Sequence, residues 1–200
     1  VFCDREKIEA DVLAETQNWM VKLGFGIATP GHVMVIPKQH FACLADIPDK
    51  LFDEFEKRVH PVLQDYIGER FSIPFEIEYG IFGQTVQHAH LHYIPKKGEG
   101  YSIESVVDEI LLKANTSFEK GNRQKLRDIR KNFERYNLFM ENGNYLICPI
   151  PLDISEEESL RLDRVLNYRV FLKLMGGNVP LSLANRTHEE IERDNAWRNE

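Results

Sequence analysis

The feature that most constrains this chain is a row of three histidines at alternate positions. His88, His90 and His92 are separated by single small or apolar residues, and Pro95 closes the run. Side chains on a β-strand point alternately to opposite faces, so a strand here would place the three imidazoles on one face, roughly 6.6 Å apart. The residues between them would face an apolar core. The pattern therefore predicts a half-buried strand that presents imidazoles to a ligand.

A purely structural role for this row is the weaker interpretation. The chain has 7 histidines, and three of them fall in this one short segment. Histidine is neither a preferred core residue nor a preferred strand former, so strict alternation indicates chemistry rather than packing. Two chemistries use such a row. The histidines can offer nitrogens to zinc at roughly 2.0–2.1 Å, or the middle imidazole can attack phosphorus while its neighbours assist.

The residues just before the row favour phosphate chemistry. Gly83, Gln84 and Thr85 supply a flexible backbone, an amide and a hydroxyl. These neutral donors suit phosphate oxygens and are not typical metal ligands. We therefore predict phosphoryl or nucleotidyl chemistry that requires no metal or cofactor. A metal-dependent hydrolase that uses the histidine strand is the alternative.

Composition and charge limit the partners and the compartment. The 200 residues carry a formal net charge of −7, and a broad nucleic-acid binder needs a basic face, so a small anion in a local pocket is the better expectation. Three cysteines without close pairs favour a reducing, cytoplasmic location. No apolar run approaches the roughly 20 residues of a membrane span, so we expect no membrane association.

The first hundred residues predict alternating strands and helices. Alternating or β-forming runs predict a hairpin over 12–23 and strands over 32–36, 75–81 and 87–94. Apolar residues at spacings of three and four predict a helix over 48–67, which Pro61 should kink or divide. We interpret residues 1–100 as the catalytic unit.

Residues 101–200 predict a C-terminal extension or small lobe that is mainly helical. The predicted elements are a basic helix within 118–137, a hairpin at 136–149 around Asn142-Gly143, a helix over about 155–175 capped by Ser155, and a short helix opening at Thr187. No linker rich in Pro, Gly or Ser marks the join, so the two parts can share a core.

Taken together, these motifs resemble the histidine triad (HIT) family. Residues 84–95 look like its signature His-φ-His-φ-His-φ-φ, where φ is apolar. Residues 30–40 resemble the family's Pro-Gly-His strand and the Pro-Lys-x-His that follows it. Phe2-Cys3 is similar to a frequent N-terminal Phe-Cys. The resemblance spans about residues 2–97, and both motifs occur in the family's order.

The resemblance implies an α+β fold, with an antiparallel sheet of about five strands, packed helices and usually a homodimer. It also implies a hydrolase or transferase that acts at the α-phosphate of a small nucleotide, such as a dinucleoside polyphosphate, a phosphoramidate or a nucleotide ester. The matching positions carry the family's roles: His90 is the nucleophile, His88 and His92 are its partners, His40 is a supporting fourth histidine, and Gln84 and Thr85 are phosphate contacts.

Two positions depart from the family pattern. The ribose-gripping Asn or Asp of many members falls here near Gly24, and Glu78-Tyr79-Gly80 is the nearest match to an Asn-x-Gly phosphate contact. A carboxylate beside a phosphate is repulsive unless it is protonated or turned away. These departures motivate another alternative, a catalytically weak nucleotide-binding or interaction module.

Three further sets of residues receive a structural interpretation. Cys3, with His40 and His88, resembles part of a zinc site found in some relatives, but we interpret Cys3 as an ordinary thiol. A basic stretch over 123–131 could reach a polyphosphate, although such runs are more often solvated helix faces. His32, in the upstream motif, is interpreted as structural.

Overall fold

The computed structural model of the protein describes most of the first 163 residues and little of the chain beyond them. The described residues are 2–24, 29–84, 86–96, 102–105, 107–108, 117–133, 135–163, 166 and 192. Thr85, the second half of the helix predicted after Ser155, and the helix predicted at Thr187 lie outside them.

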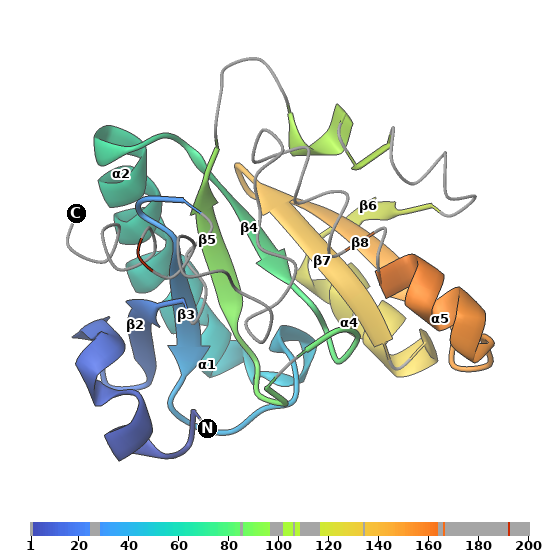
Figure 1. The fold of residues 1–200 in the computed structure, drawn as a ribbon, viewed down its shortest axis with the longest axis horizontal. Helices are drawn as coiled ribbons and strands as arrows, with labels where there is room; N and C mark the ends of the chain where they lie inside the picture. Colours follow the sequence, from blue (N-terminus) through green and yellow to red (C-terminus); the bar gives the residue numbers. More distant parts are fainter. Residues whose placement is uncertain are drawn as a thin grey trace.

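Within the described residues, eight strands form one antiparallel sheet (Figure 1). They are β1 (Val12–Glu15), β2 (Trp19–Leu23), β3 (Val33–Pro37), β4 (Pro74–Glu78), β5 (Leu91–Pro95), β6 (Glu119–Gly121), β7 (Arg135–Glu141) and β8 (Asn144–Ile150). Their order across the sheet is β1-β2-β3-β5-β4-β7-β8-β6. The α+β class is confirmed, but the sheet has eight strands rather than about five. The difference arises because β7 pairs with the outer edge of β4 and is followed across the sheet by β8 and β6.

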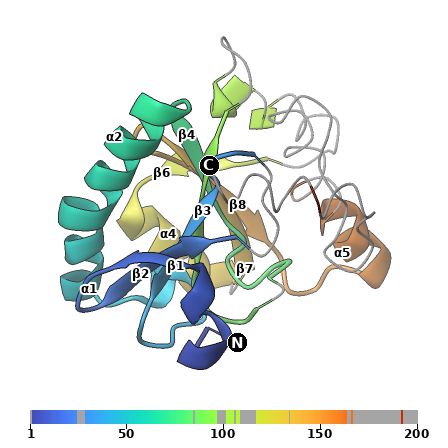
Figure 2. The same ribbon diagram turned by 60° about the vertical axis from the view of Figure 1, so that its left-hand side comes forward.

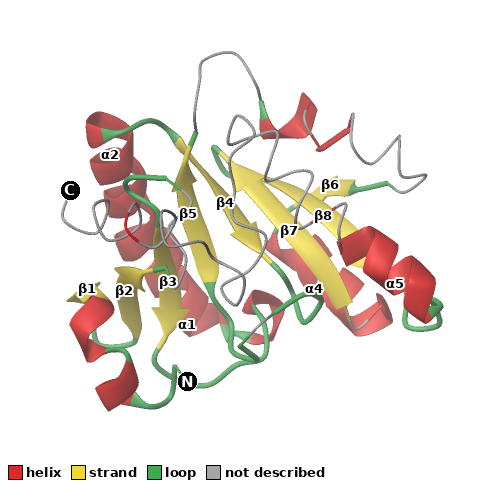
Figure 3. Cartoon of the chain, viewed as in Figure 1, coloured by secondary structure: helices red, strands yellow, loops and turns green. Residues whose placement is uncertain are grey.

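Helices cover both faces of the sheet (Figures 2 and 3). Their bounds are α1 (Asp49–Glu54), α2 (His60–Arg70), α4 (Arg123–Phe133) and α5 (Glu156–Asp163). We call the side covered by α1, α2 and α4 the helix face, and the side that carries α5 the histidine face. In its described part the extension combines helical residues, among them α4 and α5, with three strands.

The helix predicted over 48–67 is present and interrupted. After α1 comes a π-helical turn at Phe55–Val59, and α2 starts at His60, directly before Pro61. Proline has no N–H to donate, and its ring clashes with the carbonyl four residues earlier, so a wider turn ahead of it accommodates the ring. The prediction that Pro61 divides this helix is confirmed.

Strand register places the histidine row between two apolar clusters. Leu91 and Tyr93 point into the core on the helix face, as the alternation predicted. On the histidine face, Met34, His92 and Ile77 lie side by side on β3, β5 and β4. Met34 belongs to an apolar cluster formed with the N-terminal segment, and Ile77 belongs to a cluster shared with the extension. The two clusters bound the site on both sides.

Both predicted hairpins are confirmed. β1 pairs with β2 within 12–23, and β7 pairs with β8 from Glu141↔Asn144 outward. At the second turn, Asn142 has φ 52° and Gly143 has φ 76°. A two-residue type I′ turn requires this left-handed backbone at both positions, which Asn-Gly adopts readily. This turn directs β8 back along β7 and so extends the sheet.

Side chains also tie the extension to the catalytic half. Arg127 Nη1 lies 2.6 Å from Asp49 Oδ1, and Arg130 Nε lies 3.1 Å from Asp46 Oδ1. Both acidic residues belong to the segment that leads from η3 (Leu44–Asp46) into α1. The interpretation of this basic stretch as a solvated helix face is therefore wrong for these two arginines, which hold α4 against that segment.

The three cysteines are free thiols, with Cys43 and Cys148 buried and Cys3 exposed. Burial raises the pKa of the Cys43 thiol to about 12, with the charges of Glu78 and Asp46 adding to the shift. Within the described residues, no helix combines the length and the apolar character needed to cross a bilayer.

Candidate active site

The strand predicted over 87–94 begins only at Leu91, so His88 and His90 lie on the approach to β5 rather than on it. In this approach the backbone N–H of His88 donates to Val86 O (2.8 Å), and that of Ala89 donates to Phe41 O (2.7 Å). These loop bonds take the place of a strand ladder. The prediction of three imidazoles aligned on one strand is therefore wrong for the first two.

His90 is held as a neutral imidazole. Its Nδ1 lies 2.7 Å from His88 O, and because a carbonyl can only accept, Nδ1 carries the proton and Nε2 keeps its lone pair. The side chain is only 6% exposed, and this burial lowers its pKa to about 4. The Phe2 ring packs edge-on at 5.4 Å between ring centroids. The arrangement leaves a free imidazole nitrogen at neutral pH.

His92 contacts His32, which is interpreted as structural from the sequence. His92 Nδ1 lies 3.0 Å from His32 Nε2, and the His92 and His90 rings are 5.1 Å apart. Desolvation of the His92 ring lowers its pKa well below the ordinary value. The signal that could have found His32 was its place directly before the apolar strand in the Pro-Gly-His motif.

His40 lies against His88 and Cys3. The two Nδ1 atoms are 3.3 Å apart, and Cys3 Sγ lies 3.4 Å from His88 Nδ1 and 3.6 Å from His40 Nδ1. His88 Nε2 donates to Pro37 O at 2.8 Å, so a neutral His88 directs its lone pair at this cluster. The cluster therefore brings one thiol and two imidazole nitrogens to a single point.

The cluster has the dimensions of a zinc site. Zinc–nitrogen bonds of roughly 2.0–2.1 Å and zinc–sulfur bonds of about 2.3 Å in a tetrahedron set the ligand atoms about 3.3–3.6 Å apart. Cys3, His40 and His88 meet this test. They are the candidate metal ligands found here among the described residues. Water or a residue outside that part would complete the tetrahedron. The interpretation of Cys3 as an ordinary thiol does not account for this geometry.

Of the predicted phosphate contacts, Gly83 and Gln84 belong to the described residues and precede His88 in the chain. Gln84 Nε2 donates to Ala42 O at 3.1 Å, which places the side chain against the segment that follows His40. Gly83 has φ 80°, a left-handed conformation that glycine adopts without strain. Thr85 is outside the described residues. Gln84 thus has a structural partner already, in addition to any contact with a phosphate.

Comparison with known proteins identifies the family. The model of the HIT domain matches residues 5–99. Adenosine 5′-monophosphoramidase hnt1 of Schizosaccharomyces pombe is 30% identical over 105 residues, which cover 52% of this chain and 78% of that protein. This chain belongs to the HIT family. The family match covers the half that carries the histidine row, and the extension lies beyond it.

Two further proteins match part of this chain. The asymmetrical bis(5′-nucleosyl)-tetraphosphatase of Schizosaccharomyces pombe is 37% identical over 82 residues, covering 39% of this chain and 44% of that protein. A HIT family protein of Bacillus anthracis with a solved structure is 26% identical with a TM-score of 0.44, covering 57% of this chain and 94% of that chain.

Glu78, which departs from the HIT pattern, is turned away from the triad. Its Oε1 accepts from the backbone N–H of Leu44 (2.6 Å), and its Oε2 accepts from the Tyr136 hydroxyl (2.6 Å) on the helix face. The same hydroxyl accepts from Ala45 N at 3.2 Å. Burial raises the pKa of Glu78 to about 8. The carboxyl therefore does not face a phosphate, and it anchors η3 to β4 and β7.

A buried cation lies on the histidine face of this HIT protein. Lys22 on β2 is level with Met34, which is level with His92, so all three side chains project from the same side of the sheet. Lys22 is fully buried, donates to Leu23 O and lies 3.7 Å from Asp11. Its charge adds to the lowering of the His92 pKa, after burial and the neighbouring histidines. Lys22 could not be identified from the sequence, because one lysine in a strand carries no spacing signal.

Proposed function

We propose that this chain is a nucleotide-phosphate hydrolase or nucleotidyltransferase that acts at the α-phosphate through a covalent intermediate on His90. The observation that carries the proposal is the His90 Nδ1 contact with His88 O, because it leaves Nε2 unprotonated. Burial supports it further by keeping the ring neutral. A neutral imidazole is a nucleophile, whereas an imidazolium is not.

The proposed reaction has two displacements. The Nε2 lone pair attacks the α-phosphorus, the bond from phosphorus to the leaving group breaks, and an amine leaving group takes up a proton from solvent. Water or another acceptor then attacks the phosphorus and releases its proton to solvent, the P–N bond breaks, and His90 is regenerated. The intermediate replaces one difficult step with two easier ones. Hydrogen-bond donors fixed around the phosphate stabilise the charge that spreads over its oxygens.

The other histidines have different proposed roles. His88 acts through its backbone carbonyl, which fixes the His90 tautomer, and its ring is held by Pro37 O. When His32 donates to His92 Nδ1, a neutral His92 carries its proton on Nε2 and can donate to a phosphate oxygen. Lys22 supplies positive charge to the same face. Gln84 and Thr85 keep their predicted role as phosphate contacts.

Two substrate classes follow from the relatives. One relative is named as an adenosine 5′-monophosphoramidase and another as a bis(5′-nucleosyl)-tetraphosphatase. A bis(5′-adenosyl)-triphosphatase of Dictyostelium discoideum is 35% identical over 72 residues. These names support nucleoside phosphoramidates and dinucleoside polyphosphates as substrates.

A turnover assay tests this function against its alternatives. The full chain is incubated with adenosine 5′-phosphoramidate, diadenosine triphosphate and diadenosine tetraphosphate, and products are separated by ion-exchange chromatography. We expect mononucleotide from at least one substrate with the wild type and none with His90→Asn. Nucleotide binding without turnover would instead support the binding module, and activity that a chelator abolishes and added metal restores in the His90→Asn variant would support the metal-dependent hydrolase.

We also propose that zinc binds Cys3, His40 and His88 in a structural role. The metal would fix the N-terminal segment, and with it Phe2, against His90. Elemental analysis of the purified chain should give one zinc per chain, and Cys3→Ser should reduce this content. Zinc absent from both proteins contradicts the site without affecting the proposed reaction, because the metal takes no part in the steps above.

The proposal retains a homodimer in a reducing, cytoplasmic compartment. Among the described strands, β1 and β6 are at the edges of the sheet, so pairing between sheets would use one of these edges. Light scattering coupled to size-exclusion chromatography should then give about twice the chain mass of 23.3 kDa. A mass equal to that of one chain contradicts the dimer.

A further inference from the structure

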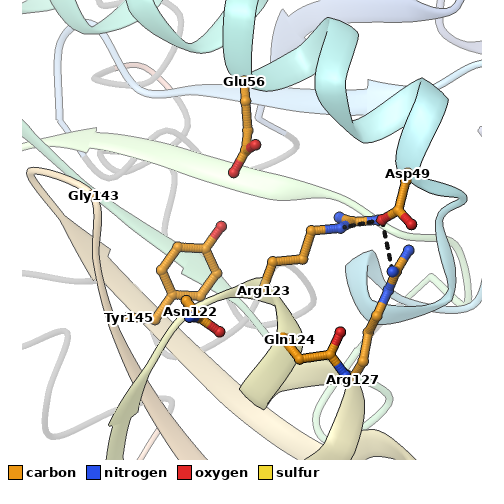
Figure 4. A pocket seen from close by; sticks show the side chains of 8 residues that line it. All are labelled: Asp49, Glu56, Asn122, Arg123, Gln124, Arg127, Gly143 and Tyr145. Atoms are coloured by element: carbon orange, nitrogen blue, oxygen red, sulfur yellow. Dashed lines mark hydrogen bonds and ion pairs between the residues drawn. The ribbon is translucent and has the colours of Figure 1, made fainter.

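A pocket lies on the helix face, where the catalytic half meets the extension (Figure 4). It measures about 470 Å³, within the range of small-molecule sites. Its walls include Asp49 and Glu56 from the α1 side, Asn122, Arg123 and Arg127 from the start of α4, and Tyr145 from β8. The histidines project from the opposite face of the sheet, so a ligand here is not the substrate of His90.

One end of the pocket carries positive charge. Arg123 Nε and Arg127 Nη1 lie 3.3 and 2.6 Å from the same Asp49 oxygen, and both guanidinium groups also donate to Ile47 O. The Asp49 carboxylate thus forms ion pairs with both arginines. Arg123 Nη1 is buried, and no described residue accepts a hydrogen bond from it. A buried donor without an acceptor costs free energy, which a ligand oxygen would recover.

The other end is polar and acidic. Figure 4 shows Glu56 above Tyr145, with the Tyr145 hydroxyl directed toward the space between them. Tyr145 is only 6% exposed, and its hydroxyl has no hydrogen-bond partner within the described part of the chain. The Glu56 carboxylate likewise makes no ion pair with a described residue, although its charge raises the pKa of Tyr145 after burial does. A hydroxyl and a carboxylate therefore face the pocket without partners among the described residues.

We propose that this pocket binds a small zwitterion, of which a free α-amino acid is the simplest. The ligand carboxylate accepts from Arg123 Nη1, and its ammonium group donates to Glu56 and to the Tyr145 oxygen. The lining charges cancel, with Arg123 and Arg127 opposed by Asp49 and Glu56, so one charge of each sign on the ligand matches the two ends. A simple anion would leave Glu56 unpaired and repelled.

Titration of the full chain by two-dimensional ¹H–¹⁵N NMR tests this proposal. The probes are the standard free amino acids, with acetate, methylamine and inorganic phosphate as partial ligands. We expect saturable shifts of the amides at 122–124 and 143–145 with at least one amino acid, and at least about tenfold weaker binding of each partial ligand.

Two variants and a control identify the groups that bind. Glu56→Gln should weaken binding about tenfold, and Tyr145→Phe several-fold, since each removes a charge-assisted hydrogen bond. Tyr145→Phe breaks no hydrogen bond among the described residues, so its melting temperature should stay near that of the wild type. Glu69→Gln removes an exposed carboxylate on α2 and should leave the affinity unchanged.

Two results would overturn the proposal. One is the absence of saturable shifts with any amino acid up to about 10 mM, a concentration above the millimolar range of weak specific binding. The other is saturation by inorganic phosphate that Glu56→Gln strengthens, which indicates a simple anion site. Neither result bears on the reaction at His90, because the two sites lie on opposite faces of the sheet.

Discussion

The histidine face buries the imidazoles of His90 and His92, whereas the helix face buries the carboxyls of Glu76 and Glu78, and burial favours the neutral form of all four groups. On the histidine face, burial lowers the pKa of His90 to about 4. On the helix face, burial raises the pKa of Glu76 and of Glu78 to about 8. An imidazole without its extra proton offers a lone pair for attack, whereas a protonated carboxyl offers no charge. Desolvation therefore favours a nucleophilic imidazole on the histidine face. On the helix face it favours neutral carboxyls that serve as hydrogen-bond partners.

The largest expected effect is on kcat, and it should differ between a variant on the histidine face and a variant on the helix face. His90→Asn should lower kcat by at least about 10³-fold, because it removes the proposed nucleophile. Glu78→Gln should keep kcat within about threefold, because an amide retains an acceptor for Leu44 N and carries no charge. Steady-state kinetics on the same substrate measures both variants. A comparable loss in Glu78→Gln would show that the helix face takes part in the chemistry.

The next effect tests Glu78 as an anchor. Glu78→Ala leaves Leu44 N and the Tyr136 hydroxyl without their buried partner, so the free energy of unfolding should fall by about 2–4 kcal/mol. Glu78→Gln should cost less than about 1 kcal/mol because it preserves the shape of the side chain. Urea unfolding at pH 7 measures the free energy of unfolding of both variants and of the wild type. Equal losses in the two variants would mean that the negative charge, and not the hydrogen bonds, anchors this loop.

The third effect is a pH dependence with a defined sign. A carboxyl whose pKa is about 8 when folded and about 4.5 when unfolded stays protonated in the folded chain after the unfolded chain has lost its proton. Its contribution to stability is complete below about pH 4.5 and is lost as the pH rises toward 8. Between pH 6.5 and 8, the contribution to stability of each of Glu76 and Glu78 should fall by about 1.6 kcal/mol.

Glu78→Gln supplies the control for this slope. The amide side chain of this variant does not titrate, so its fall in stability between pH 6.5 and 8 should be about 1.6 kcal/mol smaller than that of the wild type. Urea titrations at several pH values measure it. A stability that rises across this window in the wild type contradicts the raised pKa values.

The smallest effect compares two buried tyrosines on the helix face. Tyr136→Phe removes the donor to Glu78 Oε2 and should cost about 1 kcal/mol. Tyr93→Phe removes the hydroxyl that lies 2.6 Å from His60 Nδ1 and should cost a similar amount. Only Tyr136→Phe should speed amide hydrogen exchange at Ala45, whose N–H donates to that hydroxyl. Faster exchange at Ala45 in both variants would show that the two tyrosines act through one shared network.

Local sequence patterns predicted much of the fold. Alternation around His92 correctly placed Leu91 and Tyr93 in the core, and Asn142-Gly143 correctly marked a hairpin turn. Such features depend on a few neighbouring residues, so a single sequence reveals them. The start of β5 could not be predicted in the same way, because it depends on a bond from Ala89 N to the distant Phe41 O.

Long-range contacts account for what the sequence did not predict. The direction of Glu78 depends on Leu44 and Tyr136, which lie 34 and 58 residues away. The contact between His32 and His92 spans 60 residues. The pairing of β4 with β7 in the sheet depends on register that no local pattern encodes. The candidate site was predicted in its main members, whereas its supports were not.

Intact-protein mass spectrometry tests the central claim, covalent attack by His90, most directly. Wild type and His90→Asn are each mixed briefly with adenosine 5′-phosphoramidate or diadenosine tetraphosphate and quenched at alkaline pH, where a phosphoramidate bond survives. We predict an increase equal to one adenylyl group in the wild type and no increase in the variant. Turnover by the wild type with no adduct at any mixing time, or the same adduct in His90→Asn, would contradict the account.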